Sequence, residues 1–161
     1  MYEALLDLLL GLDGVRQDPR YHPEGDALFH SLQVFDIARR DTDDRVLWAA
    51  ALLHDVGKAV SSPDHDEVGA DLLFGLVCPR VVWLVRHHLD LLRAPSPTRR
   101  KWRGTRALSD LSQLRRWDLA GRDPKRAVLS PEEALSIVLD APFDLLSPSS
   151  ELDHDFGAEG A

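Results

Sequence analysis

Four ionisable side chains fall where the sequence pattern predicts buried helix faces: His30, His54, Asp55 and Asp118. Burying an unpaired carboxylate is costly, so each of these groups needs a compensating partner. One shared divalent cation would compensate all four, and their nitrogen and oxygen donors suit Mn, Fe, Co, Ni or Zn and, less readily, Mg. Two histidines and two aspartates also leave coordination positions open for water and substrate. The pattern therefore predicts a catalytic metal site, although His54 and Asp55 taken alone would indicate only a helix cap.

Three predicted helices carry these residues. The first lies at 27–40, where His30 shares a face with apolar residues spaced three or four apart. The second, at 45–56, is apolar on all sides, as a central buried helix is, and ends in the His-Asp pair. The third begins at residue 105 and places Asp118 in line with three leucines. All four groups should therefore point into the interior.

The remaining segments also read as helices. Leucine spacing predicts a helix at 2–12, and two more follow at 65–76 and 79–89. A strand is the alternative for VVWLV within the last of these, but no alternating segment is present to pair with it. Ser, Pro and Glu at the start of 130–140 form a capping pattern, whereas the Pro-flanked residues 94–104 predict a loop.

These elements predict an all-α fold with one domain at 1–145 and an acidic, flexible tail at 146–161. We expect about six to seven helices around the central buried one. Asp153, His154 and Asp155 could bind a metal, but a flexible acidic tail is the preferred interpretation.

Composition places the chain among cytoplasmic proteins. It has 161 residues, a net charge of −8 and a single cysteine, Cys78, which excludes an internal disulfide. The N-terminus lacks the pattern of a signal peptide, and the apolar run at 5–12 is too short to span a bilayer. We expect no contact with a membrane, and the sequence makes no prediction of the oligomeric state.

Positive charge is concentrated in one segment. From Arg93 to Arg126 there are eleven Lys or Arg against three Asp. A solvated helix face and a phosphate-facing patch are equally good interpretations of this segment. Four of the cations cluster in the predicted loop: Arg99, Arg100, Lys101 and Arg103. Trp102 lies among them, where it could stack on a base, although a place in the core or at its rim is the more common role.

The order of His30, His54-Asp55 and Asp118 resembles the H…HD…D signature of the HD-domain superfamily of metal-dependent phosphohydrolases. HPEGDALFHSLQVFD at 22–36 is similar to the HPEGD…H segment in the HD domain of bacterial CCA-adding tRNA nucleotidyltransferases. AALLHDVGKA, HDEVGA, LVRHHL and RRWDLAGRD follow in the matching order. No segment resembles the nucleotidyltransferase head domain, so the resemblance implies a standalone HD hydrolase and not CCA addition.

The resemblance also implies roles for individual residues. His30, His54, Asp55 and Asp118 would be the metal ligands, with Asp55 able to bridge a second ion. His65 and His88 match positions that hold a second metal or contact phosphate in parts of the superfamily. His87 is the alternative to His88, but the family pattern of His followed by an apolar residue favours His88.

Four further residues have alternatives that the sequence leaves open. Lys58 would contact the substrate phosphate, as a point charge does. Arg122 would contact phosphate or pair with an acid. His22 and Glu24 could line the pocket, although a turn or cap is their more common role.

The predicted function is hydrolysis of a phosphomonoester or phosphodiester by a metal-activated water. Candidate substrates are a nucleotide, a 2',3'-cyclic phosphate or an RNA end, with RNA as a further partner through the basic segment from Arg93 to Arg126. Two alternatives remain: a non-catalytic nucleotide- or RNA-binding module, and an HD-type di-iron oxygenase.

Overall fold

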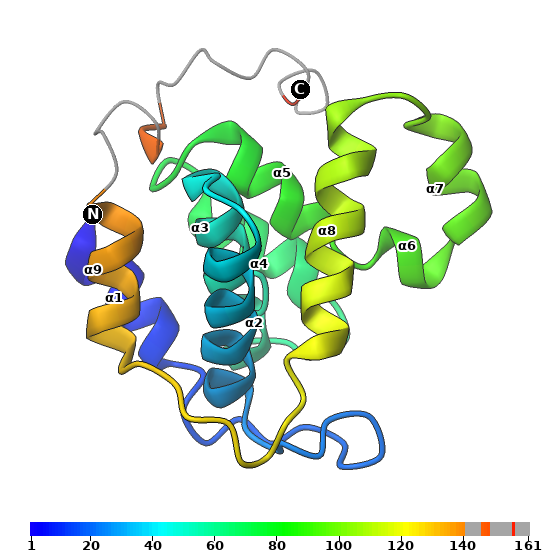
Figure 1. Cartoon of the computed structure of the whole chain (residues 1–161). Helices are drawn as coiled ribbons and strands as arrows, with labels where there is room; N and C mark the ends of the chain where they lie inside the picture. The colour runs from blue at the N-terminus through cyan, green and yellow to red at the C-terminus, as the bar shows by residue number, and fades with distance from the viewer. Residues whose placement is uncertain (141–145, 149–155, 157–161) are drawn as a thin grey trace.

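The structure, a computed structural model, describes residues 1–140, 146–148 and 156. The all-α prediction is confirmed: the regular structure of these residues is helical, apart from one isolated β-bridge between Arg16 and Asp26 (Figure 1). The helices are α1 (Tyr2–Leu10), α2 (Ala27–Asp41), α3 (Arg45–Leu53), the 3₁₀ turn η1 (Val56–Ala59), α4 (His65–Leu73), α5 (Pro79–His87), α6 (Asp90–Arg93), α7 (Pro95–Lys101), α8 (Arg106–Ala120) and α9 (Pro131–Leu139). No helix in this described part is long and apolar enough to cross a membrane.

The central position of α3 follows from its composition. Seven of its nine residues are buried, and it packs against α2, α5, α8 and α9. Asp44 begins the helix, because its carboxylate accepts hydrogen bonds from the backbone N–H groups of Val46 and Leu47. The helix ends at Leu53, earlier than predicted, and the His-Asp pair occupies the turn that follows. That turn is fixed by a buried helix, which gives both side chains a rigid base.

Two glycines allow the close approaches that assemble the interior. A Cβ atom on Gly57 would lie 2.1 Å from the backbone oxygen of His65, so glycine lets η1 touch the start of α4. A Cβ atom on Gly121 would lie 2.6 Å from Cγ2 of Val34, where the end of α8 meets α2. The first contact brings α4 to the His-Asp pair, and the second brings the end of α8 to α2.

The prediction of a loop at 94–104 is wrong, because most of these residues form α7. Pro95 occupies the first turn of this helix, where its missing N–H leaves no hydrogen bond unmade. The Thr98 hydroxyl donates to the backbone oxygen of Asp90 at 3.2 Å and ties α7 to α6. Three basic residues fill the last turn of α7, where cations interact favourably with the helix dipole. These cations therefore belong to a helix and not to a connection.

Four residues of the predicted tail, 146–148 and 156, lie within the described structure, and two of them are large apolar residues that are buried. Leu146 is 3% exposed, and Phe156 is 5% exposed with its ring centroid 5.1 Å from that of Trp83. The other tail residues with a predicted role, 153–155, lie outside the described residues. The domain boundary at 145 lies there too and stays a prediction.

Candidate metal centre

Four buried histidines direct one ring nitrogen at a backbone oxygen and the other into the interior. The Nδ1 atoms lie close to carbonyl oxygens: His30 to Gly121 at 2.8 Å, His54 to Ala51 at 2.9 Å, His65 to Ser62 at 2.7 Å and His88 to Val85 at 2.6 Å. Because a carbonyl oxygen only accepts hydrogen bonds, each Nδ1 carries the hydrogen. In the neutral ring, each Nε2 then presents a lone pair to the interior, as a metal ligand must.

The first ligand group consists of His30, His54, Asp55 and Asp118. Oδ1 of Asp118 lies 3.1 Å from Nε2 of His30, and Oδ2 of Asp55 lies 3.4 Å from Nε2 of His54. Both Nε2 atoms are buried, and in the neutral rings neither has a hydrogen-bond partner among the described residues. Lone pairs that face one another at such distances repel unless a proton or a cation lies between them. These donors therefore fit a divalent metal.

The second ligand group consists of Asp55, His65 and His88, whose donor atoms lie within 4.8 Å of one another. Oδ1 of Asp55 is 3.2 Å from Nε2 of His65 and 3.7 Å from Nε2 of His88. The two Nε2 atoms are 3.3 Å apart. Asp55 thus turns one oxygen to each ligand group, which is the arrangement a bridging carboxylate needs.

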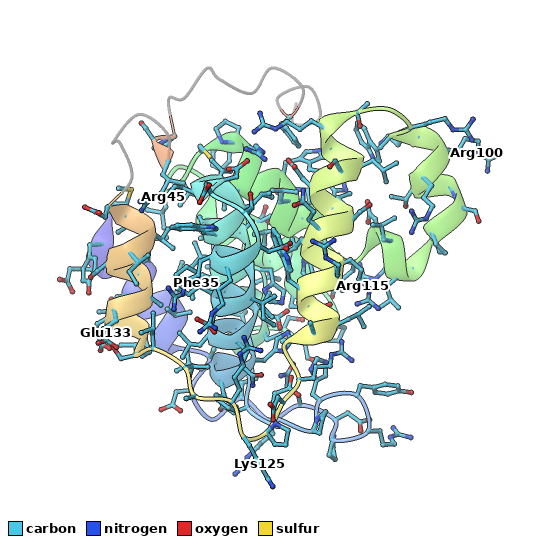
Figure 2. The ribbon with its side chains drawn as sticks, in the orientation of Figure 1. Phe35, Arg45, Arg100, Arg115, Lys125 and Glu133 are labelled. Carbon is cyan, nitrogen blue, oxygen red and sulfur yellow. The ribbon has the colours of Figure 1, made fainter. Side chains whose placement is uncertain are left out.

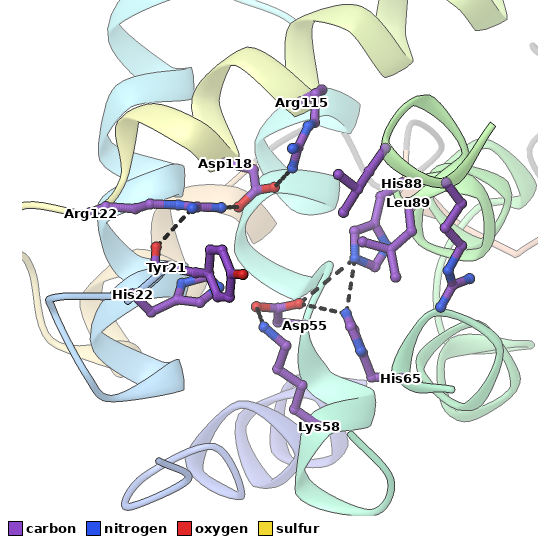
Figure 3. A pocket seen from close by; sticks show the side chains of 12 residues that line it. Tyr21, His22, Asp55, Lys58, His65, His88, Leu89, Arg115, Asp118 and Arg122 are labelled. Carbon is purple, nitrogen blue, oxygen red and sulfur yellow. Dashed lines mark hydrogen bonds and ion pairs between the residues drawn. The ribbon is translucent and has the colours of Figure 1, made fainter. Parts of the chain in front are cut away.

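A cleft of about 550 Å³ opens on these two groups (Figure 3). It reaches Asp55 and Asp118, and four cationic side chains line it: Lys58, Arg93, Arg115 and Arg122. This excess of cations over carboxylates contrasts with the chain's net charge of −8. The cleft is therefore suited to an anionic ligand.

Comparison with known proteins agrees with this geometry. The family model of the HD domain matches residues 28–134, more than half of the chain and all members of both ligand groups. The chain belongs to the HD-domain family.

Relatives of this HD domain include much longer proteins. A multifunctional CCA protein of Methylococcus capsulatus is 38% identical over 96 residues, which are 55% of this chain and 20% of that protein. A multifunctional CCA protein of Halorhodospira halophila is 42% identical over 78 residues, which are 42% of this chain and 19% of that protein. The matched region is thus about a fifth of each relative's length. The similarity concerns the HD region alone.

Burial and charge set the protonation of the first ligand group in this HD domain. Burial lowers the pKa of His54 to about 4, so this imidazole is neutral at pH 7. Burial also disfavours charge on His30, but hydrogen bonds with Asp118 and Glu24 outweigh it and raise the pKa of His30 to about 9. The hydrogen bond from His30 likewise holds the pKa of Asp118 well below its usual range, although burial opposes this. In the metal-free protein, a proton on His30 therefore takes the place of a cation.

Asp55 also stays ionised despite complete burial. Burial raises its pKa, but the neighbouring His54 and Lys58 outweigh this effect and hold the pKa well below the usual range. Nζ of Lys58 lies 2.6 Å from Oδ2 of Asp55 and 2.6 Å from Oε1 of Gln17. Lys58 therefore lies beside the cluster, and its contact with a substrate phosphate stays a prediction.

A buried carboxylate supports the first ligand group from behind. Oε1 of Glu24 lies 2.8 Å from Nδ1 of His30 and 2.9 Å from Nδ1 of His22, and Oε2 has no partner among the described residues. His22 lines the cleft, whereas Glu24 lies behind the His30 ring. The HPEGD segment thus contributes His22 to the lining of the cleft and Glu24 to the contact with His30.

Two arginines of the basic segment reach Asp118, and the sequence singled out only one of them. Arg122 lies 3.5 Å from Oδ1 of Asp118 and donates to the backbone oxygen of Tyr21 at 2.7 Å. Arg115 donates to Oδ2 of Asp118 at 2.8 Å. The available signal was its position three residues before Asp118 on a helix, which places both on one face.

Three other residues lie away from the cluster: His87, Trp102 and Asp123. His87 faces Asp90, with 2.7 Å between Nδ1 and Oδ2, so the structure turns His88 and not His87 toward Asp55. The backbone of Asp123 exchanges hydrogen bonds with the Gln33 side chain. Trp102 packs edge-on against Trp83 with 5.2 Å between ring centroids.

The cations of α7 do not line the cleft. Residues 99–103 are absent from its described lining, and Figure 2 shows Arg100 extending away from the body of the molecule. Of the eleven cations of the basic segment, three line the cleft and three lie on α7.

Proposed function

We propose that this HD domain is a metal-dependent phosphohydrolase that cleaves a phosphomonoester or phosphodiester. One observation carries the proposal: the lone pairs of four buried Nε2 atoms and two carboxylates converge beneath a cleft lined by four cations. Converging donors of this kind hold a metal ion, and the cations fit the negative charge of a phosphate ester.

The two ligand groups define where metal ions would bind. His30, His54, Asp55 and Asp118 would hold one ion, and Asp55 with the second ligand group would hold another. Their nitrogen and oxygen donors suit Mn, Co, Ni, Fe or Zn better than Mg. When bound, such an ion supplies a Lewis acid and lowers the pKa of a water molecule toward neutrality.

The cationic side chains of the cleft would bind and orient the phosphate. Arg115 and Arg122 present planar guanidinium groups that can donate two hydrogen bonds to one phosphate, and Lys58 adds a point charge. All three pair with Asp55 or Asp118, which holds them at the edge of the ligand groups. They would offset the negative charge that develops on the phosphoryl oxygens during hydrolysis.

Among substrates, we favour a nucleotide, a 2',3'-cyclic phosphate or an RNA end. The similarity to the HD region of multifunctional CCA proteins supports an RNA-related ester. The cations of α7 support RNA as a partner, because a longer strand that leaves the cleft could contact them.

Reloading of metal-free protein tests the proposal. The protein is purified without metal, loaded separately with Mn, Co or Ni, and assayed with adenosine 2',3'-cyclic phosphate, nucleoside monophosphates and p-nitrophenyl esters. We expect turnover with at least one metal, and loss of turnover in Asp55→Asn. Asp71→Asn, a change at an exposed aspartate of α4, is the matched control. Absence of turnover with every metal and ester would contradict the proposal.

The second ligand group supports an alternative, a di-iron oxygenase, because that chemistry needs two metals side by side. Iron-loaded protein that consumes oxygen with a substrate and hydrolyses no ester would favour it. A non-catalytic module makes a different prediction: Asp55→Ala should keep nucleotide or RNA binding intact in a protein that shows no turnover.

A further inference from the structure

One wall of the cleft is a closed loop, residues 16–26. The β-bridge between Arg16 and Asp26 joins its ends, and Gln17 donates its backbone N–H to the Gly25 oxygen at 2.9 Å. Inside the loop, the backbone N–H groups of Tyr21 and His22 both donate to the oxygen of Asp18, at 3.0 and 2.8 Å. The loop is therefore ordered by its own hydrogen bonds.

Three further contacts fasten this loop to the candidate metal centre. Gln17 accepts from Lys58 at 2.6 Å, and Glu24 lies 2.8 Å from His30. The backbone oxygen of Tyr21 accepts from Arg122, which also pairs with Asp118. The position of the Tyr21 backbone is thus set directly by the residues of the site.

The Tyr21 ring, by contrast, contacts an exposed side chain, Arg20, whose Cζ lies 5.6 Å from the ring centroid. Tyr21 is 61% exposed, yet it lines the cleft. In Figure 3 its side chain extends into the cleft from the side of His22, and His88 lies on the other side. Leu92, another large apolar residue that is more than half exposed, lines the same cleft. The cleft therefore combines a cationic interior with exposed apolar surface.

This combination matches one chemical class of ligand. An inorganic phosphate offers nothing that an exposed aromatic ring would cover, and a sugar phosphate offers only the small C–H face of its ring. A nucleoside phosphate offers a flat base that stacks on an aromatic ring, while its phosphate needs cations and metal ligands. No side-chain amide lines the described part of the cleft, and its cations are paired with carboxylates and assigned to the phosphate, so stacking would contribute more than base-edge hydrogen bonding.

We propose that Tyr21 is the platform on which the base of a nucleoside phosphate stacks while the phosphate lies at the two ligand groups. The proposal rests on the proposed function for the position of the phosphate and adds the residue that holds the base. Because every base has a stacking face, the site accepts different bases with similar efficiency.

Enzyme kinetics with paired substrates test this role. We measure kcat/KM for adenosine and cytidine 2',3'-cyclic phosphate and divide each value by kcat/KM for a base-free ester, glycerol 1,2-cyclic phosphate. Tyr21→Ala should lower this ratio by about 5- to 100-fold, as removal of base–aromatic stacking does. Tyr21→Phe keeps the ring and should keep the ratio. Phe74→Ala removes an exposed aromatic residue that does not line the cleft, and it should leave the ratio unchanged.

A ratio that Tyr21→Ala leaves unchanged would overturn the stacking role while hydrolysis stands. If no ester is hydrolysed, calorimetric titration with adenosine 5'-phosphate and ribose 5-phosphate separates the two proposals. Preferential binding of the nucleotide that Tyr21→Ala abolishes would support the platform and contradict the hydrolase. Equal binding of the two compounds, or binding of neither, would overturn the platform as well.

Discussion

The two ligand groups share Asp55 but differ in the charge that surrounds it. The first ligand group adds a second carboxylate, Asp118, whose pKa His30 helps to hold well below its usual range despite burial. The second group adds two imidazoles and no further carboxylate. Because a cation gains most from ionised oxygens, the first group should bind a metal ion more tightly than the second. We therefore expect two adjacent metal sites of unequal affinity in this domain.

The shared carboxylate should give the largest effect. Asp55→Asn removes a charged oxygen from both ligand groups, so both metal ions should bind more than about a hundredfold more weakly, since second-shell partners alone are worth about 10- to 100-fold. Metal content after dialysis and calorimetric titration of Mn or Co measure the change. Retention of one tightly bound ion would show that the two groups do not depend on Asp55 together.

Separate changes in each group test the inequality directly. Asp118→Asn should remove the tight ion, with a loss of affinity above about tenfold, whereas His88→Gln should lower the stoichiometry of the weaker ion and change the tight one less. Calorimetric titration of both variants with the same metal measures the affinity and stoichiometry of each ion. If His88→Gln weakened the tight ion more than Asp118→Asn does, the second ligand group would be the site of higher affinity.

Two members of the first ligand group could be predicted from sequence because they interrupt a strong helical pattern, whereas the two histidines of the second group are implied only by the resemblance to the HD-domain superfamily. His30 and Asp118 lie on apolar helix faces, where burial of an ionisable side chain costs free energy unless a partner compensates its charge. Arg115 has no such signal, since a basic residue on a helix is normally part of a solvated face. Tyr21 lies in a loop without periodicity, and only contacts distant in sequence place it at the cleft.

Helix α7 shows the opposite difficulty. Its two prolines and its charge predict a loop. In the structure, Pro95 starts a helix, and the cations lie in its last turn, where the helix dipole favours them. The order in space of α6, α7 and the cleft depends on tertiary packing, such as the bond from Thr98 to Asp90. The sequence of α6 and α7 alone does not predict that packing.

The contact of Glu24 with His30 should affect the metal affinity of the first ligand group more than that of the second. Glu24 contacts His30 and not His65 or His88, so Glu24→Gln should weaken the tight ion by about 10- to 100-fold, as loss of an outer carboxylate does. The weaker ion should be affected less. Glu67→Gln, at an exposed carboxylate of α4 that pairs with Arg86, is the matched control for metal titration. Equal weakening of both ions would mean that Glu24 supports the fold as a whole and not His30.

The pH dependence of metal binding should give a smaller effect for each pH unit than these substitutions, and the most specific one. In the metal-free protein the pKa of His30 is raised to about 9, so below that pH a metal ion must displace one proton from His30. Affinity of the first group should therefore rise about tenfold per pH unit toward pH 9 and level off above it. His54 contributes no proton at neutral pH, because burial lowers its pKa to about 4. Calorimetry in buffers of different ionisation enthalpy counts the protons released, and one proton per tight ion is the expected result. Affinity that stays constant between about pH 6 and 8 would mean that the carboxylates face a neutral His30 even without metal.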